Sequence, residues 1–170
     1  MRACTATFAA DPLEAFQAKF PAPFAVLGVR TAGKRLIGIE YLPRGVAALA
    51  PLTRLAEQAC RQIERYLDDP EFRFDLPLEY RGTPFQREVW RAISCIPSGR
   101  TKRYVELARE LGTAPRPVGG ACGANRLPLV IPCHRVVASG GIGGFMHARR
   151  GPALEIKRWL LKHEGVTTDG

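Results

Sequence analysis

A cysteine and a histidine that could carry out nucleophilic chemistry stand side by side in the second half of the sequence. Pro132, Cys133, His134 and Arg135 follow one another between two runs of branched apolar residues. A neighbouring imidazole and guanidinium lower the pKa of a thiol and raise the fraction of thiolate, which is the nucleophile. The sequence therefore predicts a reactive thiol at Cys133. The residues alone leave open a buried structural cysteine beside an exposed histidine, because neighbours on a strand point to opposite faces.

Three kinds of site combine cysteine with histidine, and the first two fit this sequence poorly. A zinc site needs four ligands at suitable spacing, whereas the chain has three histidines and five isolated cysteines without a Cys-x-x-Cys pair. A papain-like protease needs a local sequence around its cysteine that is absent here, although spacing does not exclude His147 and His163 as partners. The third kind is a thiolate that accepts a group itself and does not turn over. We therefore expect no metal.

The basic residues are concentrated in the half of the chain that holds the thiol. The chain has 170 residues and a formal net charge of +9. Residues 1–80 carry ten basic and ten acidic residues, whereas residues 81–170 carry 15 basic and 6 acidic ones. A basic half indicates a polyanion, most often nucleic acid, as its partner. Charge alone leaves an arginine-rich solvated surface equally open.

The composition is typical of a globular protein in a reducing compartment. With 46% apolar and 24% charged residues, the chain is not expected to be disordered. No run approaches the roughly 18 apolar residues of a membrane span, and residues 3–10 make a poor secretory signal. An odd number of cysteines without short spacing fits reduced thiols, so we expect a cytoplasmic protein without membrane contact. Each cysteine is expected to be a small buried hydrophobe: Cys4, Cys60, Cys95, Cys122 and Cys133.

The first half of the chain reads as a scaffold of strands and one long helix. Two apolar runs, residues 24–30 and 35–42, flank a turn and predict a hairpin. Apolar spacings of three and four predict a helix over residues 46–67, which ends before Pro70. An extended stretch, residues 72–80, leads to the second half. No chemical motif occurs in this part.

The second half predicts three short helices. Thr83 can cap the first, with Pro84 at the first helical position, and residues 96–99 end it. Residues 104–111 and 116–125 form two more, joined by a turn after Gly112, which is the helix-turn-helix plan of DNA-binding proteins. The last helix contains three glycines, each costing about 1 kcal/mol relative to alanine. Glycines permit close approach of DNA or of a neighbouring helix, and spacing alone favours the neighbouring helix.

Several spaced blocks of the second half resemble the O6-alkylguanine-DNA alkyltransferases, also called methylated-DNA–protein-cysteine methyltransferases. The resemblance covers roughly half the chain, from about Gly82 to Gly165, and it is highly specific because the blocks keep their order. The first half is similar only in length and general pattern. The matching blocks are residues 83–86 (TPFQ), 96–101 (IPSGRT), Tyr104, 116–121 (RPVGGA), Asn125, 131–137 (IPCHRVV), 140–145 (GGIGGF) and 156–165 (IKRWLLKHEG).

The resemblance implies a role for each residue of the reaction centre. Cys133 would displace guanine from the O6-alkyl carbon and keep the alkyl group as a thioether. His134 would draw off the thiol proton through a water molecule, and Glu164 would orient His134, as in a catalytic triad with a water inserted. Tyr104 would donate a proton or hydrogen bond to guanine N3. Asn125 would fix the turn between the recognition helix and the active-site strand.

The resemblance also implies how the DNA is held. Arg116 would fill the space left by the target nucleotide, which must be rotated out of the duplex before it can react. The residues against the minor groove would be Gly119, Gly120, Ala121 and Cys122, and those around the flipped base would be Val136, Phe145 and Met146. The chain departs from the family at Pro117, at Cys122 and in the longer, more basic residues 146–151. These departures leave the range of alkyl groups and the DNA affinity open.

The implied architecture is α/β: a small N-terminal strand-helix (RNase H-like) domain, residues 1–78, and a mainly helical C-terminal domain with a helix-turn-helix, residues 79–170. The implied function is single-turnover repair of O6-alkylguanine, and also of O4-alkylthymine, in duplex DNA. No cofactor is expected. We expect a monomer, and cooperative binding along DNA stays open. The rival hypothesis is a non-catalytic helix-turn-helix DNA-binding protein in which the thiol is incidental.

Overall fold

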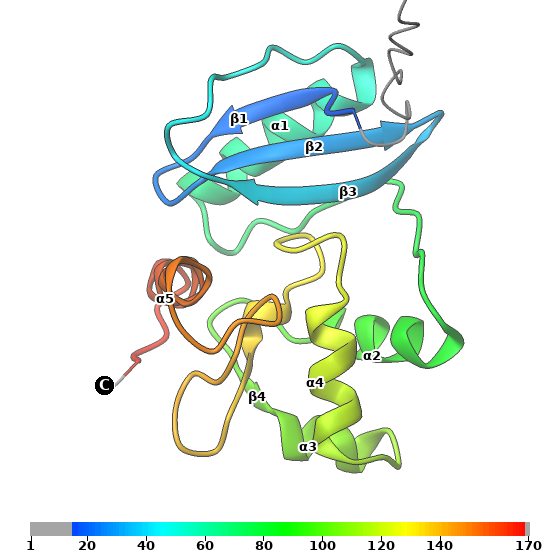
Figure 1. Cartoon of the computed structure of the whole chain (residues 1–170), viewed down its shortest axis with the longest axis vertical. Coiled ribbons are helices and arrows are strands. Elements are labelled where there is room, and N and C mark those ends of the chain that lie inside the picture. The colour runs from blue at the N-terminus through cyan, green and yellow to red at the C-terminus, as the bar shows by residue number, and fades with distance from the viewer. Residues whose placement is uncertain (1–14, 169–170) are drawn as a thin grey trace, which may run out of the picture.

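The computed structural model describes residues 15–168 and confirms a mixed α/β architecture (Figure 1). A three-stranded antiparallel sheet and helix α1 form one part, and the remaining helices surround a two-stranded parallel sheet in the other. The elements of the described chain are β1 (Ala18–Pro21), β2 (Val26–Ala32), β3 (Arg35–Leu42), α1 (Arg54–Asp68), α2 (Pro84–Ser94), β4 (Lys102–Arg103), α3 (Tyr104–Glu110), α4 (Pro115–Gly123), the 3₁₀ helix η1 (Cys133–Arg135), β5 (Val136–Val137) and α5 (Pro152–His163).

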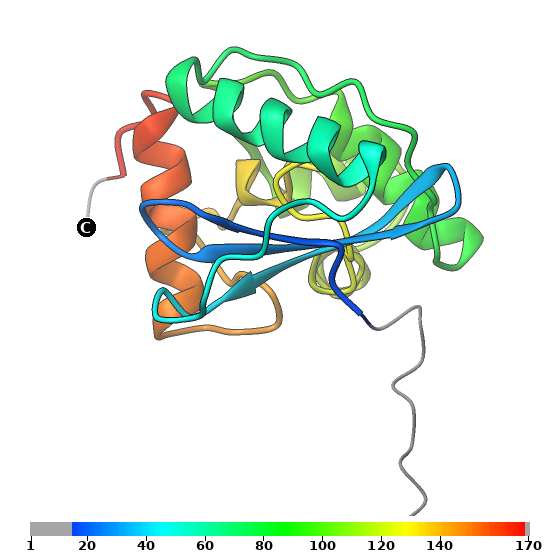
Figure 2. The same ribbon diagram turned by 90° about the horizontal axis from the view of Figure 1, so that it is seen from above.

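The sheet of the first half contains the predicted hairpin and one strand that was not predicted. Strands β2 and β3 pair antiparallel across a turn at Gly33, whose φ of +56° suits glycine. Strand β1 pairs with the other edge of β2, and α1 lies across one face of the sheet (Figure 2). The sequence did not indicate β1 because its four residues are too few to show a period.

The long helix begins later than its apolar spacing predicts. Helix α1 starts at Arg54, not at residue 46, because the side chain of Thr53 caps it by accepting from the backbone N–H of Ala56 at 3.1 Å. Before this cap, Leu49 pairs with Lys19 as an isolated β-bridge. Pro51 lies between the bridge and the cap. The predicted start was therefore wrong, and the predicted end before Pro70 is confirmed.

Helix α2 begins where the sequence placed it, with a complete capping box. The Thr83 hydroxyl accepts from the backbone N–H of Gln86 at 3.1 Å, and the Gln86 side chain accepts from the backbone N–H of Thr83 at 3.0 Å. Helices α3 and α4 also form, although α4 ends at Gly123 and not at residue 125. The indole N–H of Trp90 donates to the Ala121 carbonyl at 2.8 Å and fastens α2 to α4.

We expect Thr83→Ala to lower the free energy of unfolding by about 1 kcal/mol, because it removes the cap of α2. Urea denaturation followed by circular dichroism measures the change. Thr101→Ala is the matched control, since this exposed threonine lies outside every helix, and its change should stay within about 0.5 kcal/mol. Equal losses in both variants would contradict the role of the cap.

One hydrophobic core runs through both parts of the described chain. It joins Leu27 and Ile63 of the first part to Trp90, Leu107 and Ile131 of the second. The extended segment 72–80 leads from one part to the other and pairs at Leu78 with Leu36 of β3. Among the residues described, no helix is both long and apolar enough to span a membrane.

Candidate active site

Cys133 is the first residue of a 3₁₀ turn and is almost entirely buried. It lies on η1, not on the expected strand, and only 3% of its surface is exposed. It nevertheless lines a cavity of about 800 Å³ between α4 and the loop of residues 144–149. The cavity brings together eight residues that the sequence singled out: Tyr104, Arg116, Gly119, Gly120, Cys122, Cys133, Phe145 and Met146.

His134 and Glu164 form a buried pair behind the thiol. The Nε2 atom of His134 lies 2.8 Å from Oε1 of Glu164. Burial raises the pKa of Glu164, but hydrogen bonds from His134 and Arg135 outweigh burial and set it at about 2. Burial lowers the pKa of His134. A carboxylate therefore faces a neutral imidazole, so Nε2 carries the proton and Nδ1 is left as the basic nitrogen.

The basic nitrogen of His134 is available to accept a proton. The Nδ1 atom is buried and has no hydrogen-bond partner among the described residues. Buried polar atoms without a partner are rare and often mark catalytic positions. The pair can therefore act as a general base for a group next to His134.

Glu164 is held by two further side chains that the sequence did not single out for this role. Arg135 donates to Glu164 from Nε at 3.0 Å and from Nη2 at 2.9 Å. The hydroxyl of Tyr66, on α1, donates to Oε1 of Glu164 at 2.8 Å. The first half of the chain thus contacts the reaction centre directly, and its reading as a scaffold without chemistry was incomplete. No local motif marks Tyr66, because it is separated from Glu164 by 98 residues.

The His134 imidazole and the Arg135 guanidinium are not among the groups that lower the pKa of Cys133, in contrast to the prediction from their sequence adjacency. Burial raises the pKa of Cys133, whereas a hydrogen bond from Asn125 and the positive charge of Lys157 lower it in part. Arg135 does not act on the thiol, because its guanidinium donates to Glu164 and to the Ile96 carbonyl. The groups that lower the pKa of Cys133 are therefore the Asn125 side chain, the charge of Lys157 and the backbone N–H groups of Cys133 and His134.

Lys157 is a buried charged residue beside the site that the sequence motifs did not indicate. It is completely buried, and its Nζ donates to the carbonyls of Val136 at 2.7 Å and Gly144 at 2.9 Å. Burial lowers its pKa to about 8, against the opposing effect of Cys133. A signal was present, since Lys157 lies midway between the buried Leu154 and Leu160 on the inner face of α5.

Asn125 and Tyr104 form hydrogen bonds with backbone groups near Cys133. The Asn125 side chain donates to the Ile131 carbonyl and accepts from the Leu127 N–H, both at 2.9 Å. These bonds hold the turn between α4 and η1. The Tyr104 hydroxyl donates to the Gly144 carbonyl at 3.2 Å, and burial raises its pKa, so it stays protonated at neutral pH.

One face of helix α4, beside the cavity, carries glycines without side chains. A side chain added at Gly119 or Gly120 would meet nothing within 4 Å, so these glycines do not serve helix packing as spacing alone favoured. Gly123 differs, because a side chain there would collide with the ring of His147. Arg116 is exposed at the start of the helix. Ala121 and Cys122 face inward and are buried, so the surface of α4 offered to a partner is narrower than expected.

The remaining predicted residues lie around the thiol. Phe145 and Val136 are buried, and Met146 is half-buried with a φ of +51°. Among the described residues, no group of three or more histidine, cysteine, aspartate or glutamate side chains could hold a metal. Cys60 and Cys122 are buried as expected, whereas Cys95 is exposed. Cys4 and the segment 3–10 lie outside the described residues.

Comparisons with known proteins agree with the site. The profile described as 6-O-methylguanine DNA methyltransferase, DNA binding domain, matches residues 84–166. The methylated-DNA–protein-cysteine methyltransferase of Candida albicans is 37% identical over 130 residues, which make up 74% of this chain and 71% of that protein. The regulatory protein Ada of Salmonella typhimurium is 42% identical over 117 residues, 67% of this chain.

The likeness extends to the three-dimensional structure. The crystal structure of Mycobacterium tuberculosis OGT in complex with DNA has a TM-score of 0.72 at 30% identity, over 86% of this chain and 91% of that one. The chain spans only a third of the Salmonella regulatory protein and about half of the Shigella flexneri methyltransferase.

Proposed function

Because the chain belongs to the 6-O-methylguanine DNA methyltransferase family, we propose that it repairs alkylated DNA by moving the alkyl group onto its own Cys133. The sulfur attacks the alkyl carbon, a carbon–sulfur bond forms, and the bond from that carbon to O6 of guanine breaks. The single observation that carries this proposal is a buried thiol that lines an open cavity beside a His134–Glu164 pair. The thioether is stable, so each molecule reacts once. The substrates are O6-alkylguanine and O4-alkylthymine, without a cofactor.

The proton leaves the thiol by way of His134. Its Nδ1 atom is unprotonated and accepts the proton of Cys133 through a bridging water, while Glu164 stabilises the imidazolium that forms. Tyr104, which burial keeps protonated, turns its hydroxyl from the Gly144 carbonyl and donates a hydrogen bond to N3 of the leaving guanine. The proton and the negative charge thus move to opposite sides of the reacting carbon.

Helices α3 and α4 act as a helix-turn-helix on duplex DNA. The bare glycines of α4 allow the helix to approach the minor groove, Arg116 replaces the flipped nucleotide in the stack, and the cavity receives the base. Phe145 and Met146 line the cavity around that base, and Val136, which is buried outside the cavity lining, faces it only after the base has entered. The DNA-binding part is residues 79–170, and residues 1–78 form the second domain. The protein acts as a cytoplasmic monomer.

The test is the mass of the intact protein after incubation with duplex DNA that carries one O6-methylguanine. We expect a gain of one CH₂ unit that peptide mapping assigns to Cys133, and no gain in Cys133→Ser. Tight binding to the same DNA without a mass change would overturn the proposal and favour the non-catalytic DNA-binding protein.

Arg116→Ala is expected to slow repair of duplex DNA about tenfold or more, because a flipped base must otherwise be held out against stacking energies of a few kcal/mol. Reaction with free O6-benzylguanine needs no flipping and should change little. Single-turnover rates on both substrates measure the difference. Arg54→Ala, an exposed arginine at the start of α1, is the matched control. Equal losses on both substrates would count against this role of Arg116.

A further inference from the structure

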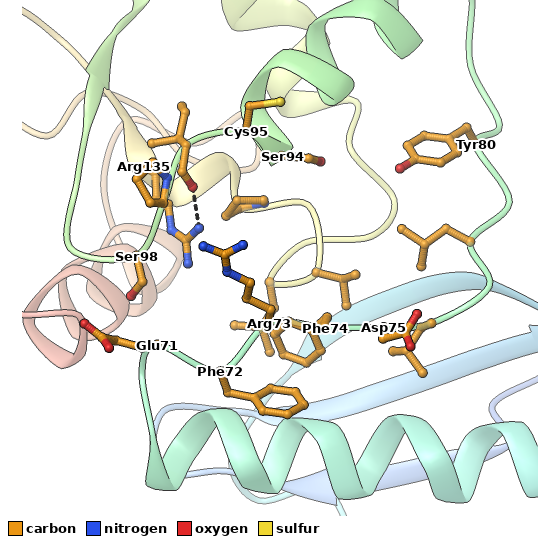
Figure 3. A pocket seen from close by; sticks show the side chains of 17 residues that line it. Glu71, Phe72, Arg73, Phe74, Asp75, Tyr80, Ser94, Cys95, Ser98 and Arg135 are labelled. Carbon is orange, nitrogen blue, oxygen red and sulfur yellow. Dashed lines mark hydrogen bonds between the residues drawn. The ribbon is translucent and has the colours of Figure 1, made fainter.

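A second cavity lies on the other side of the thiol segment. Its volume is about 850 Å³, within the roughly 300–1,000 Å³ of small-molecule sites. One wall is the extended segment 71–80 and the other is the end of α2 with the residues before η1 (Figure 3). Residues 132–135 separate the two cavities, because Cys133 lines the first cavity whereas Pro132 and Arg135 line the second.

Two guanidinium groups face each other across this cavity. Arg73 rises from the extended segment toward Arg135 on the opposite wall (Figure 3). The charge of Arg135 is compensated by Glu164, which also accepts from His134 and Tyr66. Arg73 has no hydrogen bond or ion pair with any residue that the structure describes, and its neighbours Glu71 and Asp75 point away from it (Figure 3). The exposed side chain of Arg73 therefore brings one positive charge to the cavity that no group within residues 15–168 compensates.

The rest of the lining suits a flat aromatic group. Phe74 and Tyr80 are half-buried and line the cavity, whereas the ring of Phe72 points toward α1, where the guanidinium of Arg65 lies 5.7 Å from its centroid (Figure 3). The rings of Phe72 and Phe74 meet edge to face with centroids 5.7 Å apart, so Phe74 is fixed in place. Aromatic side chains of this kind stack on nucleobases, and arginine pairs bind phosphate through several hydrogen bonds.

We propose that this second cavity binds a nucleoside monophosphate, with the phosphate between Arg73 and Arg135 and the base against the aromatic wall. A phosphate supplies the negative charge that Arg73 lacks. The cavity is separate from the one that receives the alkylated base, so the two ligands do not compete for space. Binding needs no alkyl transfer and can be tested without it.

Occupancy of this site has a consequence for the reaction, which rests on the proposed function. A phosphate that draws Arg135 toward Arg73 weakens the two hydrogen bonds from Arg135 to Glu164. Glu164 then holds His134 less firmly, and the thiol loses its proton more slowly. The nucleotide is therefore expected to be an inhibitor of alkyl transfer that does not displace DNA.

The exposed thiol of Cys95 in the wall of this cavity reports on binding directly (Figure 3). The experiment uses the Cys133→Ser protein, so the alkyl-acceptor reaction plays no part, and follows alkylation of Cys95 by iodoacetamide with peptide mass spectrometry. Deoxyadenosine 5′-monophosphate at ten times its dissociation constant should slow this alkylation roughly tenfold. Deoxyadenosine without phosphate should have little effect.

The matched variants separate the site from general charge effects. Arg73→Gln should abolish the protection of Cys95, whereas Arg54→Gln, an exposed arginine outside the cavity, should leave it intact. Absence of protection at millimolar nucleotide, or equal protection in Arg73→Gln, would overturn the proposal. Equal protection by inorganic phosphate would overturn the assignment of the base to the aromatic wall. None of these outcomes depends on whether Cys133 accepts alkyl groups.

Discussion

Glu164→Gln is expected to slow alkyl transfer by about 100-fold or more at neutral pH, since in the proposed mechanism it removes the group that orients and stabilises the general base. Oε1 of Glu164 accepts from His134, Tyr66 and Arg135, and Oε2 accepts from Arg135 again. An amide places an N–H₂ donor where one of these oxygens accepts, so donors face donors in a buried site. Single-turnover rates with O6-methylguanine DNA measure the loss.

The same variant should change how stability depends on pH. The folded-state pKa of Glu164 is about 2, below the ordinary value of 4.5, so the unfolded chain binds more protons between these values. Glu164 therefore contributes on the order of 3 kcal/mol above pH 4.5, and this contribution is lost as the pH falls toward 2. The gap in unfolding free energy between wild type and Glu164→Gln should narrow over that range.

Glu155→Gln is the matched control, because Glu155 is exposed on the same helix. We expect it to change the unfolding free energy by no more than about 0.5 kcal/mol and to leave the transfer rate unaffected. A Glu164→Gln protein that transfers alkyl groups at the wild-type rate would show that His134 does not depend on Glu164. If the difference in unfolding free energy between wild type and Glu164→Gln stayed constant from pH 7 to pH 2, the partners of Glu164 would not lower its pKa in the folded protein.

Local chemistry in the sequence was enough to predict the short elements around the site. Thr83 and Pro84 mark the start of α2 because capping depends on residues within one turn. The hairpin and helices α3 and α4 likewise follow from turn residues and short apolar periods. The start of α1 could not be predicted in the same way, since Leu49 is taken into a β-bridge with Lys19, a contact between residues 30 positions apart.

The chemistry of the thiol depends on contacts that no local pattern contains. The sequence places His134 and Arg135 beside Cys133, yet the 3₁₀ turn directs both side chains to Glu164. The charge that does act on the thiol comes from Lys157 on a different helix. The sequence therefore identified Cys133 as the reactive thiol, but the charge that lowers its pKa comes from Lys157, which α5 brings against η1.

Lys157→Met is expected to slow alkyl transfer roughly tenfold, because the Lys157 charge lowers the pKa of Cys133 and a rise of that pKa lowers the thiolate fraction. Methionine keeps the length and the apolar stem but removes the charge and both hydrogen bonds. The carbonyls of Val136 and Gly144 would be left without these donors, at a cost of about 1–3 kcal/mol each. Cys133 alkylation rates and urea denaturation measure the two effects, with the exposed Lys162→Met on the same helix as the control.

The pH dependence of the same variant shows whether the buried charge is kept for the reaction. The folded-state pKa of Lys157 is about 8, below its ordinary 10.5, so the folded protein releases a proton that the unfolded chain retains between these values. Wild type should therefore gain stability relative to Lys157→Met as the pH rises from 8 to 10.5. At neutral pH the burial of the charged amine destabilises the folded protein, and we expect its effect on the Cys133 thiol to be the reason that it is kept. If Lys157→Met reacted at the wild-type rate, the buried charge would serve only the hydrogen bonds to Val136 and Gly144. The thiol would then need another source of activation.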